Sequence, residues 1–304
     1  MESTNTQNNE KSVNNQQRFS GLGKIYAQNR PTYPPTFLDY LFSDVGMSTD
    51  SIVADIGSGT GILTRQLLAR GCKKVYAVEP NADMRAEAEA RLDEYNRQNI
   101  PLDLSADSKG NKVAKGNKVA KGNKVALYSS DLLATGFQSI AAPAEDTGLA
   151  NHCVDFITVA QAFHWFDQFL FQKECRRILK ENGKVILVWN FRDESTELIH
   201  KYDQIHRQHC PNYVENASGI KANSYQQILT TFFTGDFETK EFPNDLTFNR
   251  EGFIGRSMSS SYSLKAGDKG HEAYIAALNQ LFDAYNQDGW LLIPNRARSY
   301  VGRV

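Results

Sequence analysis

Short apolar runs recur along most of the chain and have the composition of buried strands. Ser51–Ile56 (SIVADI), Lys74–Val78 (KVYAV) and Val154–Ala160 (VDFITVA) are nearly continuous in apolar and β-branched residues. Such runs are typical of parallel strands that are buried on both faces. Phe137–Ala141 and Lys184–Trp189 have the same character, so the pattern predicts five strands between residues 51 and 189.

Helix-forming segments separate these runs. Leu63–Ala69 and Gln168–Lys180 are expected to be helices, the second of them capped by Gly183, because glycine favours the end of a helix. Ala82–Tyr95 is rich in Ala, Glu and Arg and follows Asn81, a good N-cap residue. The alternation of strands and helices predicts an α/β fold of three layers, αβα, around a doubly wound and mostly parallel sheet.

The two ends of the chain depart from this alternation. Residues 1–18 are rich in Asn, Gln and Ser and offer almost nothing to bury, so we expect a disordered tail before a domain of residues 19–304. Residues 194–285 are expected to add a C-terminal helical elaboration to this domain. Its helices are predicted at Glu194–Gln208, Arg250–Arg256 and His271–Tyr285, with a strand near Phe237–Phe242.

Residues 96–135 interrupt the pattern. They contain three copies of a six-residue unit (GNKVAK, GNKVAK and GNKVAL), with six lysines and no acidic residue from Lys109 to Lys124. Each unit offers one Val and one Ala, which is too little for the apolar face of a stacked repeat fold. A flexible, low-complexity surface insertion is the preferred interpretation, because lengthening a loop costs little closure entropy.

Composition and charge narrow the class of protein. Of the 304 residues 40% are hydrophobic and 23% charged, which is ordinary for a globular domain. Outside the lysine-rich repeat, 28 basic residues (34 less six) stand against 35 acidic ones, so no nucleic-acid partner is expected. No apolar stretch approaches the length of a membrane span, and no signal peptide is evident, so no membrane partner is expected. Four widely spaced cysteines favour reduced thiols and a cytoplasmic protein.

The most informative segment is a glycine-rich turn after the first predicted strand. It reads DIGSGTG, with Asp55 at the strand end and glycines at Gly57, Gly59 and Gly61. Glycines let the backbone turn sharply and approach a ligand, and the helix that follows presents free N–H groups to it. Glu79 ends the next strand, where an acid can accept both ribose hydroxyls of a nucleoside. The turn and the acid together predict a nucleoside-binding site.

The spacing of the glycines narrows the kind of nucleoside. A dinucleotide fingerprint has the form G-x-G-x-x-G, but the position of its third glycine is occupied here by Ile62. Asp55 beside the turn would repel a diphosphate and suits a cationic or amine-bearing ligand. A nicotinamide-dependent dehydrogenase therefore remains only as the less favoured alternative.

The chain resembles the class I S-adenosylmethionine-dependent methyltransferases in these and later segments. DIGSGTG and VYAVEPNADM are similar to their first two motifs, and AAPAEDTGL to the segment after their third strand. VDFITVAQAFHWFD is similar to their fourth strand with its loop, and FQKECRRILKENGKVILVWN to their next helix and fifth strand.

Within this class the chain resembles the type 11 family. A subgroup of that family carries the pattern Tyr-x-x-x-Arg-Pro-x-Tyr-Pro, found here from Tyr26 to Pro34. The resemblance covers about Phe19–Asn190 without the insertion. It implies a Rossmann-like, seven-stranded, mostly parallel sheet with an antiparallel last strand at about 290–304.

The resemblance also implies S-adenosyl-L-methionine as the cofactor and assigns residues to it. Glu79 would accept the ribose hydroxyls, Asp55 would hold the amino group, and Tyr26 with Arg30 would fold over the carboxylate. Gln161 would face the sulfonium region. The expected cofactor-binding residues are Tyr26, Arg30, Asp55, Gly57, Ser58, Gly59, Gly61, Glu79, Pro80, Asn81, Ala144, Glu145 and Gln161.

Several of these residues have a plainer alternative. Tyr26 and Arg30 could belong to an N-terminal lid that is packed for stability. Glu145 could be a solvated loop acid, and Gln161 could be a hydrogen-bonding residue at a strand end. These alternatives stay open from the sequence.

His164, Trp165 and Phe166 would face the methyl acceptor in this interpretation. His164 is the one candidate catalytic residue, because an imidazole can act as a general base. Methyl transfer is an in-line displacement that depends mostly on proximity and orientation, so a role for His164 in the pocket wall is preferred. Trp165 and Phe166 are expected to shape the same pocket.

The implied reaction is methyl transfer from S-adenosyl-L-methionine to an unidentified small molecule, with release of S-adenosylhomocysteine. A non-catalytic protein that binds the same cofactor is the alternative outside the enzymes. His206, His209 and Cys210 share a helix face but lack a fourth ligand, so no metal site is expected.

Overall fold

The structure is a computed structural model in which residues 31–99, 136–213, 222–260 and 262–304 are described. The expected tail, Tyr26, Arg30 and nearly all of the expected insertion lie outside the described residues. The elements that precede the third strand are α3 (Pro35–Ser43), β1 (Ile52–Ile56), α4 (Ile62–Ala69), β2 (Lys74–Val78) and α5 (Ala82–Asn99). The next are β3 (Phe137–Ile140), β4 (Val154–Ala160), the 3-10 helix η1 (Phe163–Trp165), α7 (Gln168–Ile178) and β5 (Leu179–Arg192). The last are α8 (Glu197–His209), α9 (Ala222–Phe232), β6 (Glu238–Pro243), β7 (Leu246–Phe248), α10 (Arg250–Met258), α11 (His271–Tyr285), β8 (Leu291–Ile293) and β9 (Asn295–Gly302).

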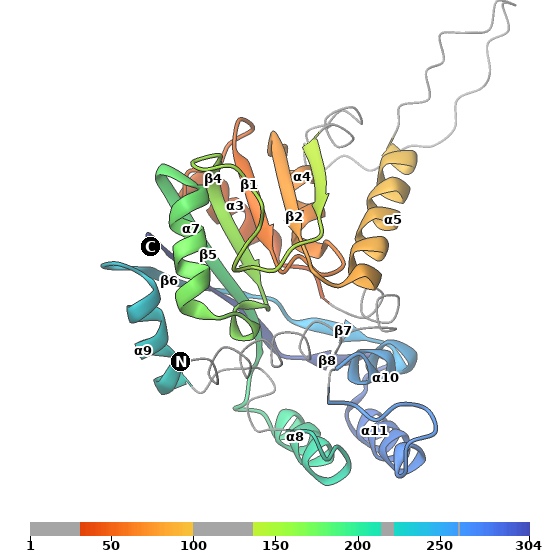
Figure 1. The fold of residues 1–304 in the computed structure, drawn as a ribbon. Coiled ribbons are helices and arrows are strands. Elements are labelled where there is room, and N and C mark those ends of the chain that lie inside the picture. Colours follow the sequence, from red (N-terminus) through yellow and green to blue (C-terminus); the bar gives the residue numbers. More distant parts are fainter. Residues whose placement is uncertain (1–30, 100–135, 214–221, 261) are drawn as a thin grey trace, which may run out of the picture.

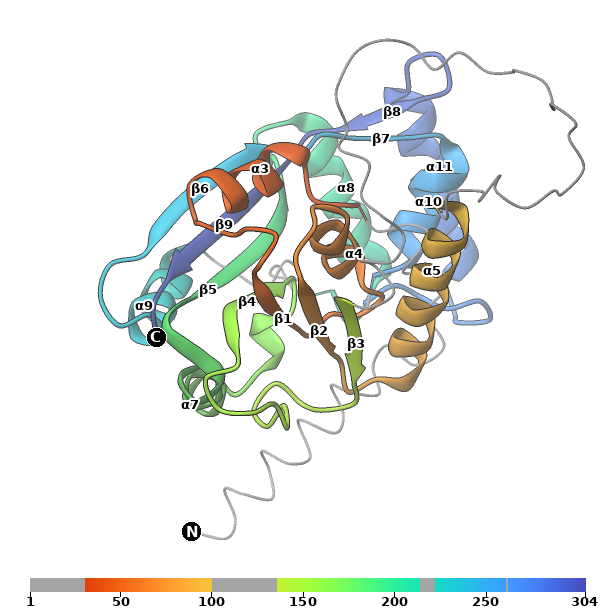
Figure 2. The same cartoon turned by 90° about the horizontal axis from the view of Figure 1, so that it is seen from above.

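The main sheet has seven strands in the order β3-β2-β1-β4-β5-β9-β6 (Figures 1 and 2). The pairings among β3, β2, β1, β4 and β5 are parallel, and β9 is antiparallel to both of its neighbours. The prediction of a mostly parallel sheet with an antiparallel last strand is therefore confirmed. β9 lies between β5 and β6, so β6 forms one edge of the sheet and β3 forms the other.

Apolar side chains fill both faces of the central strands. Along β5, Val185, Leu187 and Trp189 belong to one core cluster, while Ile186 and Val188 belong to the cluster on the opposite face. This alternation follows from the period of two along a strand, and it explains why the sequence of a doubly covered strand is continuously apolar. The layers are therefore helix, sheet and helix.

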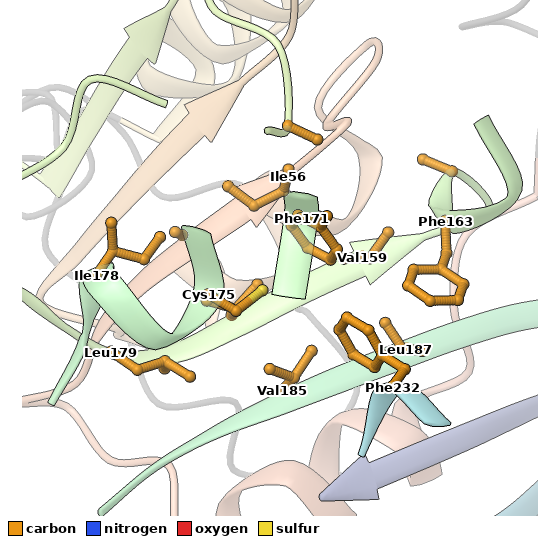
Figure 3. Close-up of a cluster of buried hydrophobic side chains, with 14 of the residues drawn as sticks. Ile56, Val159, Phe163, Phe171, Cys175, Ile178, Leu179, Val185, Leu187 and Phe232 are labelled. Atoms are coloured by element: carbon orange, nitrogen blue, oxygen red, sulfur yellow. The ribbon is translucent and has the colours of Figure 1, made fainter. Parts of the chain in front are cut away.

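The core cluster that contains Val185, Leu187 and Trp189 also contains side chains of α7 and α9 and packs these helices against the sheet (Figure 3). Phe171 and Phe232 stack with their rings 5.7 Å apart, and the ring of Phe163 lies 4.7 Å from that of Phe232. Phe163 belongs to η1, directly after β4. The same core that holds the helices on the sheet therefore fixes the loop that follows β4.

A third cluster, here called the C-terminal cluster, contains α8, α10, α11 and the two-stranded β7–β8 sheet. It lies beyond one end of the main sheet (Figure 1). Because β5 leads directly into α8, this is the end at which the parallel strands finish. The segment expected to be a helical elaboration thus contains these helices and α9, but also β6 of the main sheet and β7.

Gly183 does not cap a helix as the sequence suggested. α7 already ends at Ile178, and Gly183 lies inside β5, where a Cβ atom would stand 2.6 Å from Leu179 Cδ2 and 3.1 Å from the carbonyl oxygen of Asp155. The glycine is needed for this close approach. None of the helices in the described parts of the chain combines the length and apolar character that a membrane span requires.

Candidate functional site

The glycine-rich turn joins β1 to α4 at the edge where the parallel strands end. The backbone N–H groups of Gly57 and Ser58 both donate to the carbonyl oxygen of Val78, at 2.8 and 3.1 Å. Val78 is the last residue of β2, so these bonds hold the turn beside Glu79. The sequence separates the turn from Glu79, and the parallel pairing of β1 with β2 brings them together.

The three glycines of the turn meet different surroundings, although all three have a positive φ angle. A Cβ atom on Gly57 would stand 2.6 Å from the Cβ of Ala162, and one on Gly61 would stand 3.1 Å from the Cβ of Ala88. A Cβ on Gly59 would meet nothing within 4 Å. The expectation that all three glycines face the cofactor therefore fits Gly59 best, because the other two allow close contact with neighbouring elements.

Glu79 is held with its carboxylate against the turn. One carboxylate oxygen accepts the N–H of Gly59 at 3.0 Å, and the other accepts the N–H of Asn81 at 2.9 Å. Burial raises the pKa of Glu79, and the two N–H donors and the nearby charge of Arg85 offset this only in part. The Asn81 side chain in turn accepts the N–H of Met84 and caps α5, as its sequence position predicted.

Asp55 lies beneath the turn and is almost fully buried. Its two carboxylate oxygens accept the hydroxyls of Thr64 at 2.6 Å and Thr158 at 2.8 Å, which connects β1 with α4 and β4. Neither threonine was predicted from the sequence as a site residue. A polar residue in the buried run ITVA was the signal that could have identified Thr158. The contact of Asp55 with a cofactor amino group stays a prediction.

Burial raises the pKa of Asp55 from 3.8 to about 6, although the threonine hydroxyls lower it. Between pH 3.8 and about pH 6 the carboxyl group of Asp55 is therefore protonated more often in the folded protein than in the unfolded chain. The contribution of Asp55 to the free energy of unfolding should therefore fall by up to about 3 kcal/mol as the pH rises from about 4 to above 6.

Urea unfolding of the wild type and of Asp55→Asn between pH 4.5 and 7.5 checks this prediction. Because the amide does not titrate, the stability of the wild type relative to the variant should decrease as the pH rises. Two profiles that run parallel over this range would contradict the expectation.

The loop after β4 lies against the glycine turn, since a Cβ on Gly57 would stand 2.6 Å from Ala162 and 3.0 Å from Phe166. Gln161 has a φ of +62°, which is uncommon for a residue with a side chain, and its N–H donates to the carbonyl oxygen of Val188 at 3.0 Å. The rings of His164 and Trp165 follow, with their centroids 4.5 Å apart. Local backbone strain of this kind persists where the surrounding structure enforces it, and it is frequent at functional sites.

The segment after β3 reaches the same edge of the sheet, where the N–H of Glu79 donates to the carbonyl oxygen of Ile140 at 3.0 Å. Ala144 is buried and Glu145 is partly buried. The carboxylate of Glu145 accepts the N–H of Asp167 at 2.7 Å, and Asp167 caps α7 with its own side chain. Glu145 thereby fastens this segment to the loop that carries His164.

The structure thus brings most of the expected site residues to one edge of the sheet. They come from the ends of β1, β2 and β4 and from the segment after β3, and are Asp55, Gly57, Ser58, Gly59, Gly61, Glu79, Pro80, Asn81, Ala144, Glu145, Gln161, His164, Trp165 and Phe166. Among the described residues no three His, Cys, Asp or Glu side chains gather as a metal site would require. His206 instead packs among tyrosines of the C-terminal cluster.

The comparisons with known proteins agree with this geometry. A family model described as a methyltransferase domain matches residues 54–107 and 106–187, from β1 into β5. Over these residues the chain is similar to the type 11 methyltransferase domain family. The match includes the glycine turn, Glu79 and the His164 loop, which together line the edge where the parallel strands end.

Similar proteins occur in bacteria and eukaryotes. An uncharacterized methyltransferase of Mycobacterium bovis is 31% identical over 187 residues, which are 62% of this chain and 58% of the relative. One of Schizosaccharomyces pombe is 26% identical over 68% of this chain and 62% of its own length. The chain therefore matches about three fifths of these relatives. A putative methyltransferase of Dictyostelium discoideum is 27% identical over 83% of this chain and 81% of its own length.

Solved structures show the same methyltransferase fold. A putative type II methyltransferase from Anaeromyxobacter dehalogenans is 20% identical and superposes with a TM-score of 0.58, covering 90% of this chain and 97% of the other. A putative methyltransferase from Anabaena variabilis gives a TM-score of 0.52 at 18% identity, covering 90% and 98%. At sequence identities of 18–20% these comparisons support a shared fold and nothing more specific.

Proposed function

We propose that this chain transfers a methyl group from S-adenosyl-L-methionine to a small-molecule acceptor and releases S-adenosylhomocysteine. The observation that carries the proposal is the Glu79 carboxylate, held by the N–H groups of Gly59 and Asn81 where β1 and β2 end. A carboxylate in this place can accept ribose hydroxyls, and it lies beside a glycine turn of a methyltransferase domain.

The described residues fit the cofactor. The open space in front of Gly59 leaves room for a ligand against the backbone, and each Glu79 oxygen keeps a lone pair for a ribose hydroxyl. Glu79 and Gly59 would hold the nucleoside, with Pro80, Asn81, Ala144 and Glu145 beside the base. When bound, the cofactor supplies an electrophilic methyl group on a positively charged sulfonium.

The loop after β4 would orient the acceptor and exclude water. Gln161 directly follows β4, and the rings of His164 and Trp165 lie next to each other in the same loop. Proximity and orientation can account for much of the rate of such a transfer. His164 acts in this proposal as a hydrogen-bonding wall residue, and it becomes a base only for an acceptor that must lose a proton. Tyr26 and Arg30 are proposed to cover the cofactor carboxylate.

Two measurements test the proposed function. Calorimetry should show that S-adenosylmethionine and S-adenosylhomocysteine bind, whereas NADH and NADPH do not. Cofactor labelled in its methyl group should then transfer the label to a component of a metabolite extract. Binding without any transfer would support a non-catalytic cofactor-binding protein, and binding of NADH alone would support a dehydrogenase.

A cytoplasmic setting belongs to the same proposal. Cys72, Cys153, Cys175 and Cys210 are all free thiols, and three of them are buried. Reduced cysteines are usual in cytosolic proteins. That no nucleic-acid partner is proposed rests on the excess of acidic residues outside the lysine-rich repeat.

A further inference from the structure

A cationic side chain lies where β5 leaves the main sheet. Arg192 is the last residue of β5 and is partly buried. Its guanidinium group lies over the ring of Tyr202, 4.4 Å from the centroid, and interacts with the hydroxyl of Tyr262. A guanidinium stays charged in proteins. Among the described residues this positive charge therefore faces aromatic rings and a hydroxyl, and no carboxylate pairs with it.

Two acidic residues that follow Arg192 in the sequence are engaged elsewhere. The carboxylate of Asp193 accepts the N–H of Ser195 at 3.0 Å and its hydroxyl at 2.7 Å. Asp203, on α8, pairs with Arg207 one turn further along the same helix. Neither of them neutralises Arg192.

Asn295 lies directly beside Arg192. The two residues are opposite each other in the antiparallel pairing of β5 with β9, so their side chains share one face of the sheet. Asn295 is only 4% exposed, and its amide nitrogen has no acceptor among the described residues. A buried donor without an acceptor costs free energy, which a ligand with acceptor oxygens would recover.

His206 supplies a third polar atom from α8. The residue is fully buried; its Nδ1 shares a hydrogen bond of 3.1 Å with the hydroxyl of Tyr274, and its Nε2 has no partner among the described residues. Burial and the charges of Arg192 and Arg256 lower the pKa of His206 well below its ordinary value. The ring is therefore neutral, and its tautomer with hydrogen on Nε2 offers one more donor.

β5 connects Arg192 with the expected acceptor position. The end of β4 is fixed to β5 by the bond from Gln161 to Val188, and Arg192 lies four residues further along β5. Four residues of strand span about 13 Å. A metabolite-sized acceptor, reached by the Arg192 side chain at one end, can bridge that distance.

We propose that Arg192, Asn295 and His206 form a subsite that binds an anionic group, a carboxylate or a phosphate, of the methyl acceptor. The proposal rests on the proposed methyltransferase function. The guanidinium supplies charge and a planar fork of donors, and the two buried side chains supply the donors that complete the ring of hydrogen bonds. The acceptor would thus be an organic acid or a phosphate ester whose methylated atom lies about one strand length from its anionic end.

The first test measures anion binding to the full chain saturated with S-adenosylhomocysteine. Succinate and inorganic phosphate are titrated calorimetrically, with succinamide as the neutral probe. One of the two anions should bind and the neutral probe should not, and the anion that binds shows whether the acceptor carries a carboxylate or a phosphate. Arg192→Gln should weaken that binding about ten- to a hundredfold, and Arg192→Lys should restore part of it.

Arg250→Gln is the matched control. Arg250 also lies over an aromatic ring, that of Phe282, in the C-terminal cluster, but it has a carboxylate partner in Asp283. Its replacement should leave anion binding unchanged. An equal loss of anion binding in both variants would assign the effect to packing of the cluster and overturn the proposal.

Asn295→Asp distinguishes a loss of anion binding from a loss of stability. The new carboxylate would face Arg192 and replace the anion that the subsite is proposed to bind. We expect the melting temperature to rise or stay the same while anion binding is lost, with the affinity for S-adenosylhomocysteine unchanged. Retained anion binding in this variant would overturn the subsite. Failure of the wild type to bind S-adenosylhomocysteine would instead overturn the proposed function, and binding of the cofactor product without either anion would overturn the subsite alone.

Discussion

Replacing Glu79 by alanine is expected to weaken the binding of S-adenosylmethionine by roughly 2–4 kcal/mol, because two hydrogen bonds to a charged group are lost. The variant should still fold. Glu79 lies at the end of β2, and its removal frees only the N–H groups of Gly59 and Asn81, which water can reach once the carboxylate is gone. Calorimetric titration gives the affinity, and thermal unfolding gives the stability.

Glu197→Ala is the matched control for this variant. Glu197 lies on α8 in an i, i+4 ion pair with Lys201, and its side chain is 72% exposed. Such pairs contribute little, so affinity and stability should both stay close to the wild-type values. Wild-type affinity in Glu79→Ala would remove the ribose assignment and with it the observation on which the proposed function depends.

Alanine in place of Gly57 is expected to lower the free energy of unfolding by roughly 2–5 kcal/mol. About 1–2 kcal/mol of this comes from a residue with a Cβ at a φ of +67°. A further 1–3 kcal/mol or so comes from overpacking against Ala162 and Phe166, which stand 2.6 and 3.0 Å from the new atom. Urea unfolding measures the change.

Alanine in place of Gly59 should behave differently. Its φ of +55° carries a similar strain, but the new Cβ meets no protein atom within 4 Å, so the loss of stability should stay near 1–2 kcal/mol. The Cβ would instead occupy the space proposed for the cofactor and lower its affinity. Gly289→Ala, with a φ of +81° and open surroundings just before β8, should show the strain without any change in cofactor binding. Equal stability losses in Gly57→Ala and Gly59→Ala would contradict the different surroundings of the two glycines.

The fold of the parallel half could be predicted because its signals are local. β2 and β4 were predicted with their observed bounds, and β1 was predicted to within one residue, since strands covered on both faces need uninterrupted apolar residues. The glycine turn carried its own signal, because a positive φ at three alternate positions requires glycine. Asn81 was recognised as a helix cap for a similar reason.

Elements whose pairing partner is distant were harder to predict. β7 has three residues and can be identified as a strand only from its pairing with β8, about 45 residues later. α9 has no strong capping signal and is held by the packing of Phe232 against Phe163 and Phe171. Gly183 resembled a helix cap, and only the approach of Leu179 and Asp155 explains it.

The sequence by itself determined the class of fold, the glycine turn, the acid at the end of β2 and the resemblance to the methyltransferase domain, because each of these depends on neighbouring residues. The tertiary structure alone decided which partners the polar groups have. It placed Thr64 and Thr158 on the carboxylate of Asp55, and it placed Asn295 beside Arg192, more than a hundred residues away along the chain. Hydrogen bonds and charges act through distances of a few Å, and the distance between two side chains is set by the pairing of strands and the packing of helices.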